Sequence, residues 1–364
     1  MAEQRTISGR EREALELIER VRGKPARFRD AQVTMAHGAG GKASRTLIEG
    51  LFVPQLASEP LAELGDAARL SVDGLGLAIT TDSFVVKPIR FPGGSIGELA
   101  VNGTVNDLAV SGACPLALTL SLVLEEGLPA DELRAEVDAI AAAAAAADVE
   151  IVGGDTKVVE RGRCDSMYVT TTGIGRLDAR AGLSPAALRP GDRILVSGSI
   201  GEHGTAVMLA RGEFELDAPV ESDTRPLWPA VDALLDAVGP SLRAMRDATR
   251  GGIATVLNEL ARASGVAITV SEARVPVQPQ VAGACEILGI DAMYVANEGT
   301  LVAFVAPNAA DEALAALRSV PGCERASEIG EIRTEPPGMV LVETAFGGRR
   351  VMDLLVGDPL PRIC

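Results

Sequence analysis

The chain ends in Pro361-Arg-Ile-Cys364, which places a thiol, a candidate nucleophile, on its last residue. Chain ends are the most mobile parts of most proteins. Pro359 and Pro361 each fix the backbone angle φ and lack an N–H donor, so we expect residues 358–364 to form an extended, semi-rigid arm. An arm of this kind can carry a thiol-bound group between two sites. The alternative is a frayed end whose last residue happens to be cysteine.

The chain has five cysteines and no Cys-x-x-Cys pair. This spacing disfavours both a disulfide framework and a zinc ribbon. Cys114, Cys164, Cys285 and Cys323 are therefore expected to be small buried hydrophobic residues. Only the tail cysteine has an evident reason to be exposed.

Aspartates recur among glycines and small residues, in segments too apolar to be ordinary loops: Asp66, Asp82, Asp107, Asp155 and Asp247. Mg²⁺ sites combine a few carboxylates with the phosphate oxygens of a substrate. Each aspartate taken singly is equally typical of a helix cap or a turn. Asp107 is the strongest candidate, because Val101–Ala113 is otherwise nearly uncharged and a buried acid without a partner is costly. We therefore expect a magnesium site.

The loop His37-Gly-Ala-Gly-Gly-Lys42 precedes an expected helix. Glycines allow several N–H groups to face one anion, and the helix N-terminus adds its dipole. The loop lacks the first glycine of a P-loop. It matches the dinucleotide pattern only loosely, at Gly38, Gly40 and Ala43, and no convincing strand precedes it. Two interpretations stay open, an anion-binding loop of another type and a flexible N-terminal loop.

Two further residues are candidates for proton transfer or charge stabilisation. Lys157 follows an expected turn at Gly153–Thr156, and Glu298 stands in Asn297-Glu-Gly299 just before an expected strand. Sites in α/β proteins commonly form at strand ends. A lone lysine or glutamate is nevertheless more often a solvated surface residue.

The 364 residues are 47% hydrophobic and only 3% aromatic, which is typical of about two globular domains with closely packed small side chains. A net charge of −16 disfavours nucleic-acid binding but not a nucleotide held through Mg²⁺. No apolar run approaches the ~18 residues of a membrane helix. Met1–Arg29 lacks the apolar core of a signal peptide, so we expect a cytoplasmic protein.

Each half of the chain mixes strands and helices, which predicts an α+β fold of two sandwich domains. We divide the chain into an N-terminal extension (1–32, with a helix at Glu11–Arg22), a first domain (33–178), a second domain (179–340) and a tail (341–364). The expected strands are Leu77–Thr81, Leu116–Leu124, Val149–Val152, Met167–Thr172, Arg193–Val196, Ala267–Val270 and Leu301–Val305. The expected helices are Ser44–Phe52, Ile96–Ala109, Pro129–Ala147, Gly204–Arg211, Leu227–Val238, Ile253–Ser264 and Ala310–Ser319.

These motifs together resemble the HypE family of hydrogenase-maturation proteins, which are carbamoyl dehydratases. The stretches that carry the resemblance run in order along the chain: Ala36–Gly41, Thr81–Ser83, Phe91–Gly94, Asn106–Gly112, Gly154–Val159, Arg246–Gly252, Asn297–Gly299 and Pro361–Cys364. The terminal cysteine motif is specific to this family. The aspartate and glycine motifs are shared with the wider superfamily of aminoimidazole ribonucleotide synthetase and selenophosphate synthetase.

The resemblance implies a function and a set of roles. A carbamoyltransferase, HypF, would load a carbamoyl group onto Cys364, and Mg-ATP would then be used to remove water and leave a thiocyanate. The five aspartates would hold Mg²⁺ and ATP phosphates, and Glu298 with Lys157 would form a proton-transfer pair. The remaining expected ATP contacts are His37, Gly38, Gly40, Gly41, Asn106 and Thr156.

The resemblance also implies two domains of the aminoimidazole ribonucleotide synthetase type, a homodimer with ATP at its interface, and delivery to a HypC–HypD iron-carrying complex. One alternative is another kinase or synthetase of the superfamily, although selenophosphate synthetases use a cysteine or selenocysteine near the N-terminus, and His37 has no cysteine nearby. A second alternative is a non-catalytic carrier in which nucleotide binding only positions the arm.

Overall fold

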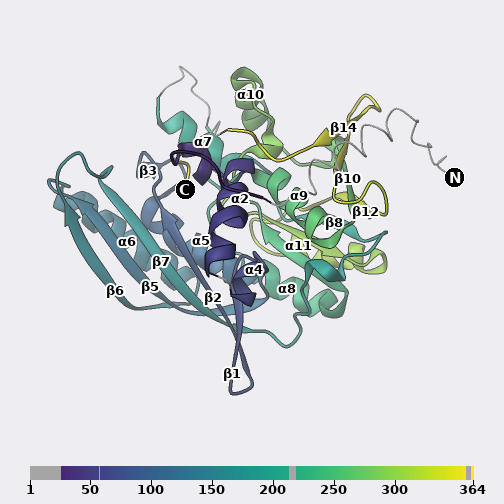
Figure 1. Ribbon diagram of the computed structural model, residues 1–364, viewed down its shortest axis with the longest axis horizontal. Helices are drawn as coiled ribbons and strands as arrows, with labels where there is room; N and C mark the ends of the chain where they lie inside the picture. Colours follow the sequence, from purple (N-terminus) through teal and green to yellow (C-terminus); the bar gives the residue numbers. More distant parts are fainter. Residues whose placement is uncertain (1–25, 57, 213–218, 358–361) are drawn as a thin grey trace.

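The computed structural model describes residues 26–56, 58–212, 219–357 and 362–364 (Figure 1). The expected helix at Glu11–Arg22 and most of the expected 358–364 arm lie outside these residues. Two sheets form the centres of two domains, and helices pack on them. Within the described ranges, none of the helices is both long enough and apolar enough to cross a membrane.

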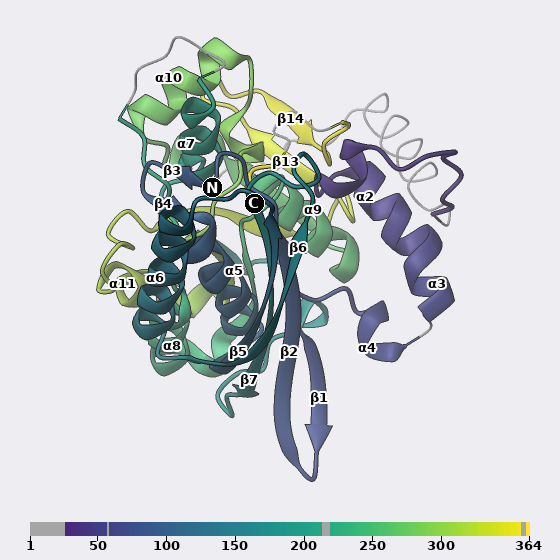
Figure 2. The same ribbon diagram turned by 90° about the vertical axis from the view of Figure 1, so that its left-hand side faces the viewer.

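The first domain is built on a five-stranded sheet of order β1-β2-β7-β5-β6. Its strands are β1 (Ala68–Val72), β2 (Leu75–Phe84), β5 (Ala113–Glu125), β6 (Glu150–Val159) and β7 (Met167–Leu177). All neighbours are antiparallel except β5 and β6, which are parallel and joined through a helix. Helices α5 (Ile96–Val110) and α6 (Ala130–Ala146) lie on one side of this sheet, and the α2–α4 segment lies on the other (Figure 2).

Helix α5 is apolar on nearly all sides, and 13 of its 15 residues are buried. It packs against β2, β5, β7 and α6 of its own domain and against α8 and β9 of the second domain. A helix that is apolar all round belongs in the interior of a protein. The polar residues Asn106 and Asp107 of α5 are therefore held inside the protein, and Asn106 bonds to the second domain.

The second domain is built on a seven-stranded sheet of order β14-β13-β10-β12-β8-β11-β9. Its strands are β8 (Arg193–Val196), β9 (Leu242–Asp247), β10 (Ala267–Ser271), β11 (Leu301–Val305), β12 (Ser327–Arg333), β13 (Val340–Glu343) and β14 (Arg349–Met352). One hydrophobic core joins a face of the sheet to α9 (Gly252–Ser264). The other core joins the opposite face to α8 (Trp228–Val238) and α11 (Ala310–Arg318).

Shorter elements complete the two domains. The N-terminal segment runs through α2 (Lys42–Leu47), a π-helical turn (Ile48–Phe52), α3 (Val53–Leu56) and α4 (Glu59–Ala62). A two-stranded ribbon of β3 (Arg90–Phe91) and β4 (Gly94–Ser95) leads into α5. Helices α7 (Glu202–Ala210) and α10 (Pro279–Leu288) contribute to a third core, which the first domain shares.

The structure corrects the sequence analysis at Gly153–Thr156, which is not a turn. Strand β6 continues from Glu150 to Val159, and its pairing with β5 shifts register between Leu118 and Thr119. Gly154 lies directly against the backbone of Leu120, so a side chain could not fit there. Glycine is required here for the close approach of two strands, not for a change of chain direction.

Three other expectations differ from the structure. Asp82 lies within β2 rather than after it, β9 and α10 were not expected, and the expected helix at 44–52 is divided between α2 and the π-helical turn. The second sheet continues to Met352, so the expected boundary between 340 and 341 falls inside β13. The remaining expected helices and strands are present, with ends that differ by a few residues and a longer β7.

Candidate functional site

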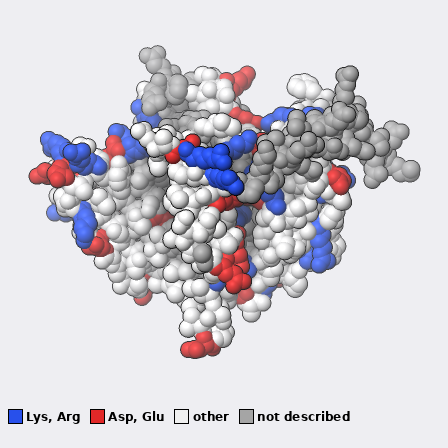
Figure 3. Space-filling view, viewed as in Figure 1, with Lys and Arg blue, Asp and Glu red and all other residues white. Residues whose placement is uncertain are grey.

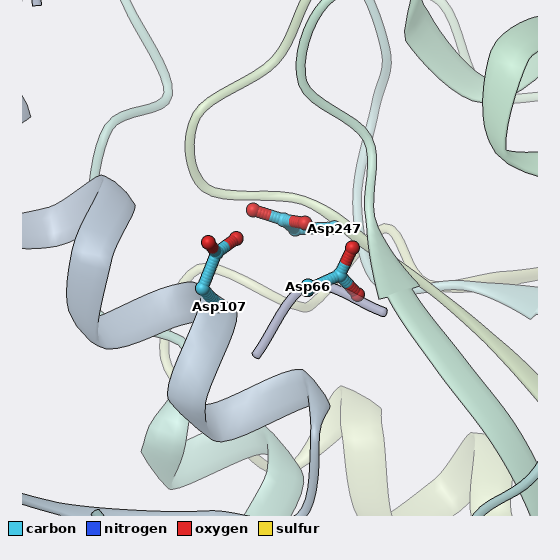
Figure 4. Close-up of side chains that lie close together, drawn as sticks. All are labelled: Asp66, Asp107 and Asp247. Carbon is cyan, nitrogen blue, oxygen red and sulfur yellow. The ribbon is translucent and has the colours of Figure 1, made fainter. Parts of the chain in front are cut away.

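Three aspartates from different parts of the chain form a cluster at the junction of the two domains (Figure 4). Asp66 precedes β1, Asp107 lies on α5, and Asp247 ends β9. One carboxylate oxygen from each lies within 4.8 Å of the others. The carboxylates point into a common space, and Asp66 and Asp107 keep some exposure to solvent. A hard divalent cation prefers this set of donors.

The electrostatics of the cluster show that it carries an excess of negative charge. Burial, and then the neighbouring aspartates, raise the pKa of Asp107 and Asp247 well above the usual range. Burial also raises the pKa of Asp66, although the ion pair with Arg246 opposes this. These shifts are the expected result of burying several carboxylates close together. The chemistry of the donors therefore fits Mg²⁺.

Asp82 adds a fourth carboxylate to the cluster. It lies on the same face of β2 as Thr80, toward α5, and its carboxyl group hydrogen-bonds to Asp107. Thr80 donates a 2.8 Å hydrogen bond from Oγ1 to Asp107 and a 2.9 Å bond to the carbonyl oxygen of Asp66. Burial raises the pKa of Asp82, and the positive charge of Arg250 partly offsets this. The alternation of side chains along β2 thus places both Thr80 and Asp82 at the cluster.

Glu298 is buried, with 3% of its surface exposed, next to this cluster. Burial is the main reason that its pKa lies well above the usual range, and the charges of Asp247, Asp223 and Asp82 add to the effect. Arg250 acts in the opposite direction. A carboxyl group with a pKa shifted upward can exchange protons closer to neutral pH.

The last three residues of the chain dock onto the first domain. The N–H groups of Val85 and Lys87 donate to the main-chain oxygens of Cys364 and Arg362, at 3.0 and 3.3 Å, which extends β2 with an antiparallel partner. Ile363 is 4% exposed within the third core. The arm, defined from here on as Arg362–Cys364, therefore occupies an inward position.

Side chains on several elements hold this arm. Arg362 forms a 2.5 Å ion pair with Asp165 and lies 5.9 Å from the ring centroid of Tyr168. Lys87 also pairs with Asp165, at 2.6 Å, and together these contacts lower the pKa of Asp165 to about 2. His203, from α7, forms a 2.6 Å hydrogen bond from Nε2 to the carbonyl oxygen of Ile363.

Cys364 lines a cavity of about 160 Å³ between the domains. Gly38, Ser83 and Arg250 also line it. The Arg250 guanidinium donates a 2.6 Å hydrogen bond to the carbonyl oxygen of Gly38, and the negative charge at Cys364 is the largest contribution to its raised pKa. Asp82, Glu298 and Asp107 raise that pKa as well. The positive charge of Arg250 therefore interacts both with the arm and with the acidic cluster.

The glycine-rich loop precedes a helix as expected, but several of its polar groups bond within the protein. The N–H of Gly40 donates to Ser44, and the N–H of Lys42 donates to the carbonyl oxygen of Leu355. Nε2 of buried His37 bonds to Asp30 at 3.0 Å. Gly40 packs against the backbone of Arg250, and Gly41 packs against Leu355. Of the expected contacts in this loop, only Gly38 lines the cavity in the described part of the chain.

Asn106 joins the two domains. Its Nδ2 donates to the carbonyl oxygens of Arg225 and Glu298, both at 3.0 Å, and its Oδ1 accepts the N–H of Leu227 at 2.7 Å. All three partners belong to the second domain. An ATP contact from Asn106 stays a prediction, because its amide is already engaged with the protein.

Within one chain, the aspartate cluster lies apart from three of the expected site residues, Asp155, Thr156 and Lys157. They are exposed on the edge strand β6, where Lys157 pairs with Asp155 at 2.6 Å. β6 is three strands from β2, or about 14 Å. Asp155 is in register with Ser83 through Ser121 and Thr170, so Asp155 and Lys157 face away from α5. The expected pairing of Lys157 with Glu298 is therefore not formed within the chain.

The sequence analysis did not single out Arg250, His203 or Asp165. Arg250 stands three residues after Asp247, within the Arg246–Gly252 stretch, and this adjacency was the available signal. His203 is one of two histidines in the chain, and Asp165 follows a cysteine in a loop. Neither position has a local pattern that predicts contact with a segment about 160 to 200 residues later.

Comparisons with known proteins agree with this architecture. The chain matches the AIR synthase related protein families, the N-terminal domain over residues 64–177 and the C-terminal domain over residues 189–342. It is 47% identical to carbamoyl dehydratase HypE of Cupriavidus necator over 342 residues, which are 94% of this chain and 97% of that protein. These matches define the class as two-domain proteins related to AIR synthase.

Solved structures point to one family within the class. A crystal structure of a HypE–HypF complex has a TM-score of 0.81 at 43% identity and covers 85% of this chain and 99% of that chain. A structure of HypE in complex with ATP has a TM-score of 0.77 at 44% identity and covers 92% and 100%. The chain belongs to the carbamoyl dehydratase HypE family of hydrogenase-maturation proteins, which confirms the resemblance and the fold class expected from the sequence.

The crowding of carboxylates generates a prediction about stability. Because the pKa of Asp107 is raised on folding, its ionised form opposes folding at neutral pH, and this penalty disappears as the pH falls toward about 4. We expect Asp107→Asn to raise the melting temperature of the metal-free protein at neutral pH by about 2–4 °C. We also expect it to abolish the rise in melting temperature that Mg²⁺ gives the wild type.

Calorimetry at neutral pH and near pH 4, with and without Mg²⁺, checks this prediction. Asp138→Asn, which changes an exposed aspartate on α6, is the matched control and should leave both quantities unchanged. A lower melting temperature for Asp107→Asn together with an intact response to Mg²⁺ would contradict the proposed metal site.

The contacts of the docked arm generate a second prediction. Arg362→Ala removes the ion pair with Asp165 and the contact with Tyr168, which together stabilise the inward position by about 1 kcal/mol. We expect alkylation of the Cys364 thiol to become about 5-fold faster, since the arm is released more often. Mass spectrometry of the modified peptide measures the rate.

Arg349→Ala is the control for Arg362→Ala. Arg349 makes a 2.7 Å ion pair with Glu343 on the β13–β14 hairpin, away from the arm. It should leave the alkylation rate at the wild-type value. Equal rates for Arg362→Ala and the wild type would show that the ion pair does not hold the arm.

Proposed function

We propose that this protein uses Mg-ATP to dehydrate a carbamoyl group on the Cys364 thiol to a thiocyanate, which supplies the cyanide ligands of nickel–iron hydrogenases. The docked arm is the observation that carries the proposal. It places Cys364 in a cavity whose wall residue, Arg250, interacts with Asp82, Asp107 and Glu298. A relative has been solved with ATP and another with HypF, which supports ATP as the cofactor and HypF as the carbamoyl donor here.

The residues divide into three roles. Asp66, Asp107 and Asp247, with Asp82 beside them, would hold Mg²⁺. When bound, Mg-ATP supplies the phosphoryl group that turns the amide oxygen of the carbamoyl group into a leaving group. The carbamoyl group loses that oxygen and its two nitrogen protons, the oxygen departs in inorganic phosphate, and ADP remains. The C≡N bond is complete without any oxidant or reductant.

Arg250 and Glu298 act on the arm. The Arg250 guanidinium lines the cavity beside Cys364 and stabilises negative charge that develops there. Glu298 accepts a proton from the carbamoyl nitrogen, for which its upward-shifted pKa suits it near neutral pH. Burial of Ile363 and the bonds of the arm to Val85 and Lys87 hold the thiol in one place during the reaction.

We further propose that Lys157 and Asp155 serve the site of a second copy of the chain in a homodimer. The side of the first sheet away from α5 exposes Leu70, Val72, Leu75, Ile79 and Ile174. Figure 3 shows that the middle of this side carries few charged side chains. Exposed apolar surface of this kind is typical of a protein interface. Asp155 and Lys157 point from the same side of the sheet and would face the partner chain.

The remaining parts of the proposal concern the setting. The arm would leave its inward position to receive the carbamoyl group from HypF, and it would later pass the cyanide to a HypC–HypD complex. Both exchanges require the arm to break non-covalent contacts such as those with Asp165 and His203, which is a reversible change. The place of action would be the cytoplasm.

The decisive measurement is the intact mass of the protein after reaction with HypF, carbamoyl phosphate and Mg-ATP. We expect an adduct that has lost one water relative to a carbamoyl group, and we expect no adduct on Cys364→Ala. A carbamoyl adduct that persists with ATP would instead leave a carrier without dehydratase activity. No adduct on the wild type would favour another reaction of the wider superfamily.

A mixture of two inactive variants tests the role of Lys157 across the dimer. Lys157→Ala keeps Cys364, and Cys364→Ala keeps Lys157. If Lys157 serves the partner's site, dimers formed from one chain of each kind regain up to about half of the wild-type thiocyanate yield, because one complete site is formed. If Lys157 acts within its own chain, the mixture stays inactive. Sedimentation confirms that the two variants form dimers.

A further inference from the structure

Asp223 lies in the segment that connects α7 to α8, and its carboxylate holds the loop that carries Glu298. Its Oδ1 accepts the N–H of Glu298 at 3.0 Å. Its Oδ2 accepts the N–H of Gly299 and the hydroxyl of Thr300, both at 3.0 Å. Three donors on consecutive residues therefore bond to one carboxylate. Charge-assisted bonds of this kind are stronger than those between neutral groups.

The backbone around Glu298 is held on its other side as well. Asn106 donates to the carbonyl oxygen of Glu298 at 3.0 Å. Both the N–H and the C=O of Glu298 are therefore hydrogen-bonded. Gly299 lies directly against the backbone of Asp223, and the carbonyl oxygen of Asp223 occupies the space that a side chain would need. Glycine at 299 thus permits the close contact on which the bonds to Asp223 depend. These contacts fix the backbone from which the Glu298 side chain extends.

The same segment reaches the docked arm. The hydroxyl of Ser222, adjacent to Asp223, is 2.8 Å from Nδ1 of His203, whose Nε2 bonds to the carbonyl oxygen of Ile363. With Nε2 as the donor to that carbonyl, Nδ1 is the acceptor for the Ser222 hydroxyl. Residues 222 and 223 therefore contact the arm through His203 and the Glu298 loop directly. One short segment connects the two groups that must meet in the reaction.

We propose that Asp223 is a positioning residue that holds Glu298 at the distance and angle required for proton transfer from the carbamoyl nitrogen on Cys364. The inference rests on the proposed function, and it adds a residue that does not itself contact the substrate. Loss of the three bonds would let the Glu298 loop move. A displacement of about 1 Å is enough to slow a catalysed step roughly 100-fold.

A single-turnover experiment on the full-length protein tests the proposal. Wild type, Asp223→Asn, Glu298→Gln and the double variant are loaded with the carbamoyl group by HypF and mixed with Mg-ATP, and the loss of water is followed by mass. We expect Asp223→Asn to be roughly 100-fold slower, with a KM for ATP within about 2-fold of wild type. We expect the double variant to be no slower than Glu298→Gln, because Asp223 acts through Glu298.

Two further variants separate positioning from folding. Asp291→Asn alters another aspartate of the second domain, which accepts the N–H of Met293 at 2.9 Å, and should keep the wild-type rate. Thr300→Val keeps the shape of the side chain and removes one of the three donors to Asp223, so it should slow dehydration several-fold even if Asp223→Asn does not fold.

The outcomes are distinguishable. A wild type that dehydrates beside Asp223→Asn or Thr300→Val at the full rate overturns this inference and leaves the proposed function intact. A double variant slower than Glu298→Gln by the full factor of Asp223→Asn also overturns it, since the two residues would then act independently. A wild type that keeps its carbamoyl group overturns the proposed function and this inference together.

Discussion

Repulsion among the carboxylates of Asp66, Asp82, Asp107 and Asp247 is the constraint that the rest of the structure accommodates. Like charges this close oppose folding unless protons or a cation are bound. Strands β2 and β9 and helix α5 hold these aspartates together, because hydrophobic cores lie on both sides of the cluster. The stability of those cores is what allows the acids to stay close. A divalent ion that binds here relieves the repulsion between the aspartates, and this relief adds to its affinity.

Among the residues that the structure describes, two arginines bring positive charge near this cluster of aspartates. Arg246 pairs with Asp66 at one side, and Arg250 lies toward Cys364 at the other. The first fixes an acid in place, whereas the second faces a cavity and is open to solvent within it. The two arginines therefore lie at different places, Arg246 in the acidic cluster and Arg250 in the wall of the cavity that Cys364 lines. Either arginine could stabilise the negative charge of a phosphate group bound near it.

Much of this arrangement could be predicted from the sequence, because it depends on local patterns. Helix α5 was predicted from its polar and apolar spacing, and Asp107 was singled out as an acid within the nearly uncharged stretch Val101–Ala113. Lys157 was misplaced because Gly153-Gly154 reads equally as a turn or as a strand in close contact with a neighbour. Only the register with β5 distinguishes the two.

Strand β9 was missed for a related reason. Its sequence, Leu-Arg-Ala-Met-Arg-Asp, has charged residues at positions 243 and 246 that disguise a buried strand. Arg246 is accommodated by Asp66, 180 residues earlier in the chain. Arg250 likewise has its role through the arm, more than a hundred residues later. Pairings over such separations are decided by the fold and leave no local pattern.

The docking of the arm along β2 has a consequence for where its sulfur can lie. The main-chain bonds from Val85 and Lys87 can form with any residue, whereas the side chains of Arg362 and Ile363 make contacts that depend on the register. The thiol is one residue beyond Ile363, and each residue of an extended chain spans about 3.3 Å. One extra residue between Ile363 and Cys364 would therefore carry the sulfur past the reacting position while the arm still docked normally. The position of the sulfur is therefore set by the number of residues between Cys364 and the Arg362–Asp165 ion pair.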